Sequence, residues 1–325
     1  MKPLQTIAGT KFSKFDFNQF DKVRDGLALI KNWLERWTHV PLTGLDWGSS
    51  YLKVVQLGWV DGQIVLHKVF IRNIEKESAV LIKQELAQNQ IAVDQVAAGL
   101  SSPEVIARIF QFPPMPRKEL HHAIQLEAEQ VVLNGHSLRE MTLDWHPLAN
   151  SNGTTRGLLT VAPREILAAR LKKLKEAGIT PRIMDVEGLA LWNAYWNLIG
   201  KNQNSNQTVL LANVGARTTN LVIGKGRDEL LMMRDFQSPR AESIEEFGDS
   251  ISYARSKAGL RQLDRIYLTG GASNPQLGEQ LSTLTDTPVS LWNPLDQVGC
   301  CPGSIENSAG PLLTVAIGLA LRHAG

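Results

Sequence analysis

The fold of this chain is decided by one stretch, Leu42-Thr-Gly-Leu-Asp-Trp-Gly-Ser-Ser-Tyr-Leu-Lys-Val-Val-Gln-Leu57. An apolar approach ends at Asp46, a tight Gly48-Ser49-Ser50 corner follows, and an apolar, β-branched run leads back. This order predicts a β-hairpin whose turn presents bare backbone N–H groups beside a carboxylate. Converging N–H groups bind anions, and an adjacent Asp is suited to hold a metal ion next to that anion.

A second stretch of the same pattern lies about half a chain downstream, Val209-Leu-Leu-Ala-Asn-Val-Gly-Ala-Arg-Thr-Thr-Asn-Leu-Val-Ile-Gly224. When the two stretches are overlaid, Asp46 aligns with Asn213 and Gly48 aligns with Gly215. Two hairpins of one pattern predict a duplicated fold with a ligand between the halves. The length of 325 residues agrees, because chains of this size usually divide into at least two domains.

A third glycine-bearing turn, Leu268-Thr-Gly-Gly-Ala-Ser273, follows a predicted strand over residues 264–268 and opens a predicted helix over 275–284. Glycines there let the backbone approach a flat or charged ligand, and the helix N-terminus favours anions. Many proteins use a single Gly-Gly turn of this kind. The order of hairpin, hairpin and strand–Gly-Gly–helix is much more specific than any one of the three.

Composition excludes several classes of protein. The chain has 43% hydrophobic and 20% charged residues, which is typical of a soluble globular protein, and its net charge of +2 is too small to indicate a nucleic-acid partner. The two cysteines, Cys300 and Cys301, are adjacent and so suit neither a loop-closing disulfide nor a zinc pair, which favours a reduced, cytoplasmic compartment. No apolar run reaches the roughly 18 residues of a transmembrane helix, and residues 1–40 lack the apolar core of a signal peptide.

Residues 1–40 form an N-terminal amphipathic extension in this interpretation. Apolar residues recur at helical spacing from Val23 to Trp37, with lysines and arginines interleaved on the other face. One hypothesis is peripheral membrane contact through residues 12–40, or docking on a partner. The other is a helix packed on its own domain, and the pattern leaves both open.

The remaining segments predict two lobes with an insertion. Residues 41–92 and 184–206 form the first lobe, and 93–183 form an inserted α/β subdomain. Its features are a strand over 105–112, a stiff Pro-rich break at 113–116 and a helix over 117–133. A polar linker over 201–207 leads to the second lobe, 207–325, in which 225–261 is a truncated subdomain.

These residues give the sequence a resemblance to the superfamily of actin, the heat-shock chaperones and the sugar kinases, whose two phosphate hairpins and adenosine turn occur in this order. Within it the sequence looks most like the PilM-like assembly proteins of type IV pili, including the MshI proteins of MSHA pili. The resemblance extends from Leu42 to Leu321 and rests on the three turns and on Leu126-Glu-Ala-Glu-Gln130, Ala162-Pro-Arg-Glu165, Asp185-Val-Glu-Gly-Leu-Ala190 and Val315-Ala-Ile-Gly-Leu-Ala320. It implies an α/β, actin-like (ribonuclease H-like) two-lobe fold with an inserted FtsA-type α/β subdomain and a shortened second lobe.

The resemblance also implies a function. It implies a cytoplasmic adaptor on the inner-membrane assembly platform of a type IV or MSHA-type pilus, similar to proteins that bind ATP and hold the cytoplasmic tail of a PilN-like membrane partner. The implied ligand-binding residues are Asp46, Gly48, Ser49, Ser50 and Lys53 at the phosphates, Asn213, Gly215, Ala216, Arg217 and Thr218 opposite them, and Gly270, Gly271 and Ala272 under the nucleoside. Asp46 is the implied metal ligand if Mg²⁺ accompanies ATP.

Two departures from the family pattern leave two interpretations of the ATP site open. Asn213 stands where relatives usually have Asp, and the short segment over 225–261 replaces a larger subdomain that helps to enclose the adenine. The cleft therefore either still binds ATP with Mg²⁺ or is the vestigial site of a scaffold, and we expect no efficient hydrolysis. An ATPase or small-molecule kinase of the same fold is an alternative. A kinase needs a catalytic carboxylate near the transferred phosphate and a substrate pocket, and Asp46 is the one candidate base. An FtsA-like division or shape adaptor is disfavoured by the N-terminal position of the amphipathic segment.

Overall fold

The computed structural model describes residues 43–60, 63–75, 78–131, 137–148, 153–203, 207–227, 229–237, 243–257, 259–299 and 305–322. Residues 1–40 were predicted to form an amphipathic extension. This predicted amphipathic extension lies outside the described residues, as do Cys300 and Cys301.

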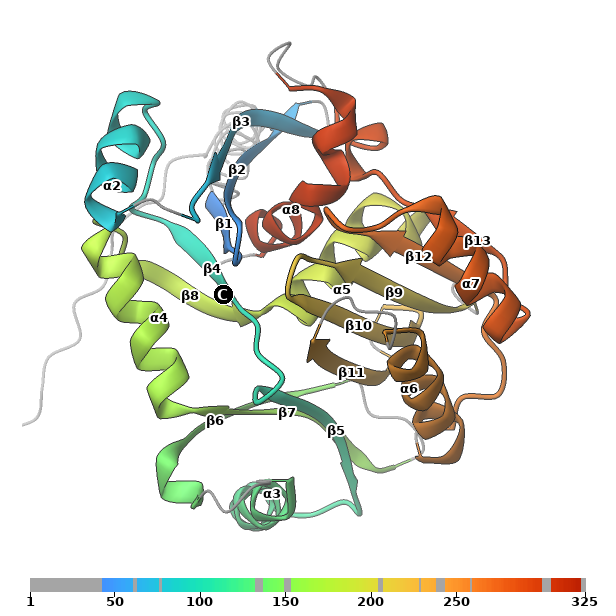
Figure 1. Cartoon of the computed structure of the whole chain (residues 1–325). Coiled ribbons are helices and arrows are strands. Elements are labelled where there is room, and N and C mark those ends of the chain that lie inside the picture. Colours follow the sequence, from blue (N-terminus) through green and yellow to red (C-terminus); the bar gives the residue numbers. More distant parts are fainter. Residues whose placement is uncertain are drawn as a thin grey trace, which may run out of the picture. The chain divides into compact units, whose positions relative to one another are not determined.

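The first hairpin belongs to a five-stranded sheet of the order β3-β2-β1-β4-β8 (Figure 1). Its strands are β1 (Thr43–Trp47), β2 (Tyr51–Val60), β3 (Gln63–Asn73), β4 (Val96–Leu100) and β8 (Pro181–Val186). The strands β1, β2 and β3 pair antiparallel, whereas β4 and β8 join in parallel. Every residue of β1 and of β4 is buried, as expected for central strands that are covered on both faces.

The second hairpin belongs to a sheet of the same construction, in the order β11-β10-β9-β12-β13. Its strands are β9 (Thr208–Val214), β10 (Thr218–Lys225), β11 (Glu229–Gln237), β12 (Arg265–Thr269) and β13 (Val289–Leu291). Again three antiparallel strands are followed by two that join in parallel. The duplicated fold predicted from the two hairpins is therefore confirmed.

A third, three-stranded sheet of the order β5-β7-β6 forms the core of the inserted subdomain. It contains β5 (Ile106–Phe112), β6 (Met141–Pro147) and β7 (Thr155–Pro163), with α3 (Arg117–Val131) and the short 3₁₀ helix η1 (Leu138–Glu140). Leu120, Ile124 and Ala128 recur every fourth residue on α3 and pack together in one core cluster with Phe110 and Leu159. This spacing places the three residues on one face of the helix, and that face is the buried one.

Sheet membership differs from the domain boundaries predicted at residues 93 and 183. β4 pairs with β1, with Ala97 opposite Gly44, so it belongs to the first lobe. The helices α2 (Ala79–Gln88) and α4 (Arg164–Glu176) share that lobe's core, in which Ile82 and Leu174 are buried together. The inserted part is therefore limited to the segment between β4 and α4.

Two helices, α5 (Glu187–Leu198) and α8 (Thr314–Ala320), pack against each other between the two five-stranded sheets (Figure 1). α8 follows the 3₁₀ helix η4 (Asn307–Leu313) and contacts β1, β2 and β4, although it lies in the segment predicted to be second lobe. Glycines permit this packing: a Cβ on Gly44 would lie 1.9 Å from the carbonyl oxygen of Ala316.

The second sheet carries α6 (Ser243–Lys257) and α7 (Pro275–Thr285), and the 3₁₀ helices η2 (Gly200–Asn202) and η3 (Pro294–Asp296) lie in connections. The described part of the predicted truncated subdomain consists of β11 and α6, so this segment completes the sheet. None of the helices in the described ranges is both long and apolar enough to cross a membrane.

Candidate functional site

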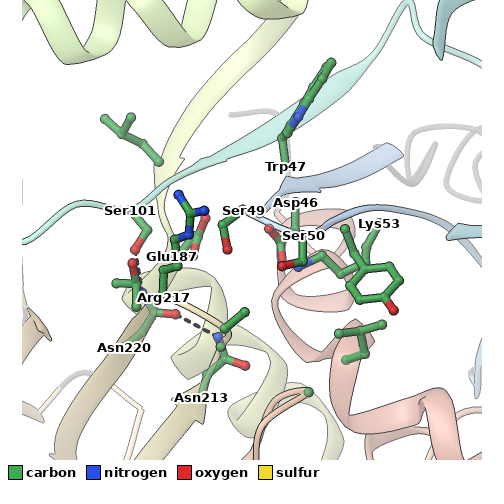
Figure 2. Close-up of a pocket in the computed structure, with 18 of the residues that line it drawn as sticks. Asp46, Trp47, Ser49, Ser50, Lys53, Ser101, Glu187, Asn213, Arg217 and Asn220 are labelled. Atoms are coloured by element: carbon green, nitrogen blue, oxygen red, sulfur yellow. Dashed lines mark hydrogen bonds and ion pairs between the residues drawn. The ribbon is translucent and has the colours of Figure 1, made fainter. Parts of the chain in front are cut away.

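A cleft of about 660 Å³ lies where the β1–β2 turn, the β9–β10 turn and the turn after β12 meet (Figure 2). Predicted site residues from all three turns line it: Asp46, Gly48, Ser49, Ser50, Lys53, Asn213, Gly215, Ala216, Arg217, Thr218, Gly271 and Ala272. Gly270 instead packs its backbone against the second hairpin: a Cβ there would lie 2.4 Å from the carbonyl oxygen of Val214.

The two hairpin turns have the same backbone geometry. The N–H of Gly48 donates to the carbonyl oxygen of Tyr51 at 2.9 Å, and the N–H of Gly215 donates to that of Thr218 at 3.0 Å. A Cβ on Gly215 would lie only 2.8 Å from the carbonyl oxygen of Thr218. The overlay of the two stretches therefore reflects a shared turn, and the close approach of its two sides explains its glycine.

The first hairpin carries a buried ion pair across its strands. Asp46 and Lys53 are register partners, and Lys53 Nζ lies 2.6 Å from Asp46 Oδ2. The two residues are only 4% and 8% exposed. A charge withdrawn from water to this extent needs a partner, and here each residue is the partner of the other.

The second hairpin carries an amide pair at the equivalent position. Asn213 and Asn220 are register partners, and Asn213 Nδ2 donates to Asn220 Oδ1 at 2.7 Å. Asn220 Nδ2 donates in turn to Asp235 Oδ1 at 2.9 Å and to Ser101 Oγ at 3.0 Å. The Ser101 hydroxyl donates to Asp235 Oδ2 at 2.8 Å. Because Ser101 follows β4 and Asp235 lies on β11, this network joins the two lobes.

The other residues of this network, Ser101, Asn220 and Asp235, were not predicted from the sequence. Asn220 had a detectable signal, since it falls on Lys53 when the hairpins are overlaid. Asp235 and Ser101 had no such signal in the sequence, because each joins this network only through contacts between distant segments. Burial raises the pKa of Asp235 to about 6, although hydrogen bonds from Asn220 and Ser101 oppose this shift.

Glu187, the first residue of α5, is a further buried acid at the cleft and was also missed. It lies against β4, where a Cβ on Gly99 would be 3.0 Å from its Cγ. Burial and then the negative charge of Asp46 raise the pKa of Glu187 to about 8, although Arg170 and Lys53 oppose the shift. At pH 7 this carboxyl group is therefore mostly protonated.

The helix α4 contributes two cations to the cleft. Arg170 donates a hydrogen bond to the carbonyl oxygen of Trp47, and Lys173 Nζ lies 4.6 Å from the centre of the Trp47 ring. Burial and then the neighbouring Arg170 lower the pKa of Lys173. Arg217 adds a cation from the second hairpin (Figure 2). With Glu187 protonated and Asp46 paired, the arrangement favours anionic ligands.

The turn after β12 is fixed by the protein's own backbone. The N–H of Gly270 donates to the carbonyl oxygen of Pro311 at 3.1 Å, and the N–H of Ala272 donates to that of Val214 at 2.9 Å. Gly270 has a φ of 98°, a left-handed conformation that favours glycine. These two N–H groups hold the turn in place, so the turn offers Gly271 and Ala272 to a ligand mainly as a flat surface.

The metal ion predicted at Asp46 does not fit the donor set. Mg²⁺ is bound through one or two free carboxylates together with phosphate oxygens and water. Asp46 is already paired with Lys53, and the second hairpin supplies an amide in its place. Nor do the described residues contain any group of three or more His, Cys, Asp and Glu side chains that could hold a metal ion.

Comparison with known proteins gives a family match and several structural matches. Residues 44–238, more than half of the chain, match the family model of the type IV pilus assembly protein PilM. A solved PilM–PilN type IV pilus biogenesis complex is similar with a TM-score of 0.73 and 24% identity, over 88% of this chain and 99% of that chain. Together with the duplicated sheets, this match confirms the predicted actin-like, two-lobe fold.

Two further structures match at lower scores. One is a Bacteroides thetaiotaomicron protein with an actin-like ATPase fold and unknown function, with a TM-score of 0.48 and 11% identity over 78% of this chain and 91% of that chain. The other is the cytoplasmic domain of EpsL, an inner-membrane component of the type II secretion system of Vibrio cholerae. Its TM-score is 0.47 and its identity 12%, over 86% of this chain and 94% of that chain.

Proposed function

Because the chain belongs to the type IV pilus assembly protein PilM family, we propose that it is a cytoplasmic adaptor of the inner-membrane platform that assembles a type IV or MSHA-type pilus. In this role it holds the cytoplasmic tail of a PilN-like membrane protein. The proposal is supported by the fold shared with a protein that was solved as a PilM–PilN complex.

One observation on this chain carries the adaptor role: two strand edges face one groove. β5 is an edge strand of the three-stranded sheet, and β11 is an edge strand of the second five-stranded sheet. A groove of about 520 Å³ lies between them, lined by Pro103, Val105, Ile106, Ala107, Met233, Arg234, Asp235, Phe236, Gln237 and Glu246. An edge strand presents a row of backbone N–H and C=O groups to which an extended peptide adds as a further strand.

The chemistry of the groove specifies the kind of tail that it takes. Ile106 and Ala107 contribute partly exposed apolar side chains to its walls, while Arg234 and Glu246 form an ion pair of 2.7 Å beside them. An extended peptide therefore places alternate apolar side chains against the walls while its backbone pairs with the edge. We expect a short apolar segment of the tail to supply the contact.

The test is a titration of the full chain with synthetic peptides that copy the cytoplasmic tails of the membrane proteins encoded beside its gene. Ala107→Trp fills the groove and should weaken the binding of the correct tail at least about tenfold. Gln111→Trp is the matched control, because it lies on the same strand with its side chain on the same face but outside the groove lining. If no tail binds the unmodified chain, the adaptor proposal fails.

A place on the membrane face is part of the same proposal. The support is the amphipathic pattern of residues 12–40 in the sequence, with Trp37 on its apolar face and Trp33 at the border of that face. Flotation with anionic liposomes, with and without residues 1–40, measures their contribution. Equal flotation of the two forms would remove the membrane contact from the proposal and leave the tail binding intact.

We propose as a second function that the cleft binds a phosphate-bearing nucleotide such as ATP. The support is the pair of matching glycine turns, which face each other across a cleft lined by Lys53, Arg170, Lys173 and Arg217. Arg217→Gln should weaken ATP binding measured by calorimetry, whereas Arg261→Gln, outside the cleft lining, should not. The kinase alternative gains no support, because a kinase needs a free carboxylate near the transferred phosphate, and Asp46 is paired.

A further inference from the structure

We propose that the cleft binds its phosphate-bearing ligand without a divalent metal ion, because Lys53 supplies the positive charge at the first hairpin turn. This inference rests on the nucleotide binding proposed above and specifies its chemistry. It concerns the ionic form of the ligand that the cleft takes: the free polyphosphate rather than its Mg²⁺ complex.

The position of the Lys53 ammonium group is the first step. A Cβ on Gly48 would lie 3.1 Å from Lys53 Nζ, so the ammonium group lies directly against the turn. Gly48, Ser49 and Ser50 of this turn line the cleft, as Lys53 itself does (Figure 2). The chain therefore places a fixed cation at the point where the sequence predicted a phosphate and a metal ion.

The fixation of this cation is the second step. Lys53 lies on β2 directly opposite Asp46 on β1, and both strands are interior to the sheet. The pair is separated by 2.6 Å. For Mg²⁺ to bind Asp46, the carboxylate would have to leave Lys53, and the ammonium group would remain buried without its partner. Removing one partner of a buried ion pair is strongly unfavourable, so the metal ion competes poorly with the resident lysine.

The opposite side of the cleft is the third step. The amide of Asn213 donates to Asn220 and carries no charge that would help to hold a cation. Arg217 lies in the second turn, and Arg170 and Lys173 approach from α4. Guanidinium and ammonium groups are good partners for phosphate oxygens. The positive charge that a polyphosphate needs is thus supplied by side chains on three sides of the cleft.

The first experiment measures ATP binding to the full chain by calorimetry in EDTA and again in excess Mg²⁺, with tripolyphosphate as a second probe. We expect ATP in EDTA to bind at least as tightly as ATP in Mg²⁺, because Mg²⁺ neutralises part of the charge that the cleft recognises. Binding that requires Mg²⁺ would overturn this inference and leave nucleotide binding standing. Absence of binding in both buffers would overturn nucleotide binding and this inference together.

A pair of variants separates the resident cation from the metal site. Asp46→Asn removes the implied metal ligand but keeps Lys53, so ATP should still bind in EDTA within about threefold of the unmodified chain. A metal-dependent site would instead bind ATP in Mg²⁺ and not in EDTA, and it would lose the binding in Mg²⁺ with this variant. Lys53→Gln frees the carboxylate, and ATP binding should then become at least about tenfold tighter in Mg²⁺ than in EDTA. If Lys53→Gln fails to fold by circular dichroism, the Asp46→Asn result alone decides.

Discussion

The β1–β2 and β9–β10 hairpins hold the same two positions against each other, Asp46 with Lys53 in one and Asn213 with Asn220 in the other. Their turns close with equivalent hydrogen bonds from Gly48 and Gly215. In the first hairpin the paired side chains form an ion pair, and in the second they are hydrogen-bonded amides. One backbone geometry therefore accepts two kinds of polar pair.

The difference teaches what the fold requires at this position and what is free to vary. Three of these four side chains are buried and the fourth, Asn213, is half-buried, so their polar groups must be satisfied, but either an ion pair or an amide pair does this. The kind of polar pair in each hairpin then determines what that hairpin supplies to the cleft and to the contact between the lobes. The ionic pair brings a cation to the cleft, whereas the amide pair passes hydrogen bonds through Asn220 to Ser101 and Asp235 on different lobes.

Breaking the ion pair of the first hairpin should lower the free energy of unfolding the most. Lys53→Met leaves Asp46, which is 4% exposed, without its partner, and should lower the free energy of unfolding by about 3–5 kcal/mol. The double change Asp46→Asn with Lys53→Asn copies the second hairpin and should recover most of this loss. Urea denaturation measures both. A loss below about 1 kcal/mol in Lys53→Met would show that the pair does not bear on folding.

The burial of Glu187 beside the first hairpin should also be visible in the pH dependence of stability. The folded-state pKa of Glu187 is raised from 4.5 to about 8, so between these values the folded protein binds more protons than the unfolded chain. The free energy of unfolding should therefore fall as pH rises through this window. Between about pH 5.5 and about pH 8 the fall should be about 3 kcal/mol larger in the unmodified chain than in Glu187→Gln. Parallel stability curves for the two would refute the assignment.

Placing a charge in the second hairpin should lower the free energy of unfolding by an intermediate amount. Asn213→Asp removes the N–H donor to Asn220 and sets two acceptors against each other, which should cost about 2 kcal/mol in the free energy of unfolding. Adding Asn220→Lys rebuilds the ion pair of the first hairpin and should recover part of the loss. Thermal and urea unfolding of the single and double variants measure the coupling, and equal stability of all three proteins would contradict it.

Removing the hydrogen bond between Ser101 and Asp235, which joins the lobes, should lower the free energy of unfolding the least. Ser101→Ala removes the hydroxyl that donates to Asp235 Oδ2 at 2.8 Å, and should cost about 1 kcal/mol in the free energy of unfolding. Ser102→Ala is the neighbouring control, because its hydroxyl accepts from the Glu104 N–H outside the network. It should stay within about 0.5 kcal/mol of the unmodified chain. Similar losses in both variants would mean that the network adds nothing specific.

Local features of the fold were predictable because they depend on short segments. Ser78 caps α2 through its side chain, and Gly178 has the positive φ of 74° expected just beyond the end of α4. The glycine turns were predictable for the same reason. Even the pairing of Asp46 with Lys53 follows from the hairpin once its turn is fixed, although the sequence led us to assign both residues to the phosphates and metal.

Other features depended on contacts between distant segments. Whether β4 belongs to the first sheet or to the inserted one is decided by its pairing with β1, and α8 reaches the first sheet from the end of the chain. Ser101 and Asp235 meet although 134 positions separate them. No local pattern specifies such partners, because each depends on how complete sheets and helices pack.

The sequence by itself determined the duplicated hairpins, the family resemblance and the residues of the three turns, since these are written in spacing and residue type. Only the tertiary structure decided how those residues are used. It buried Asp46 against Lys53, where the charge of each satisfies the other, and it raised the pKa of Glu187 by withdrawing it from water beside Asp46. Charge and burial are properties of the assembled cleft, which explains why the metal predicted from the residue types finds no free carboxylate at Asp46.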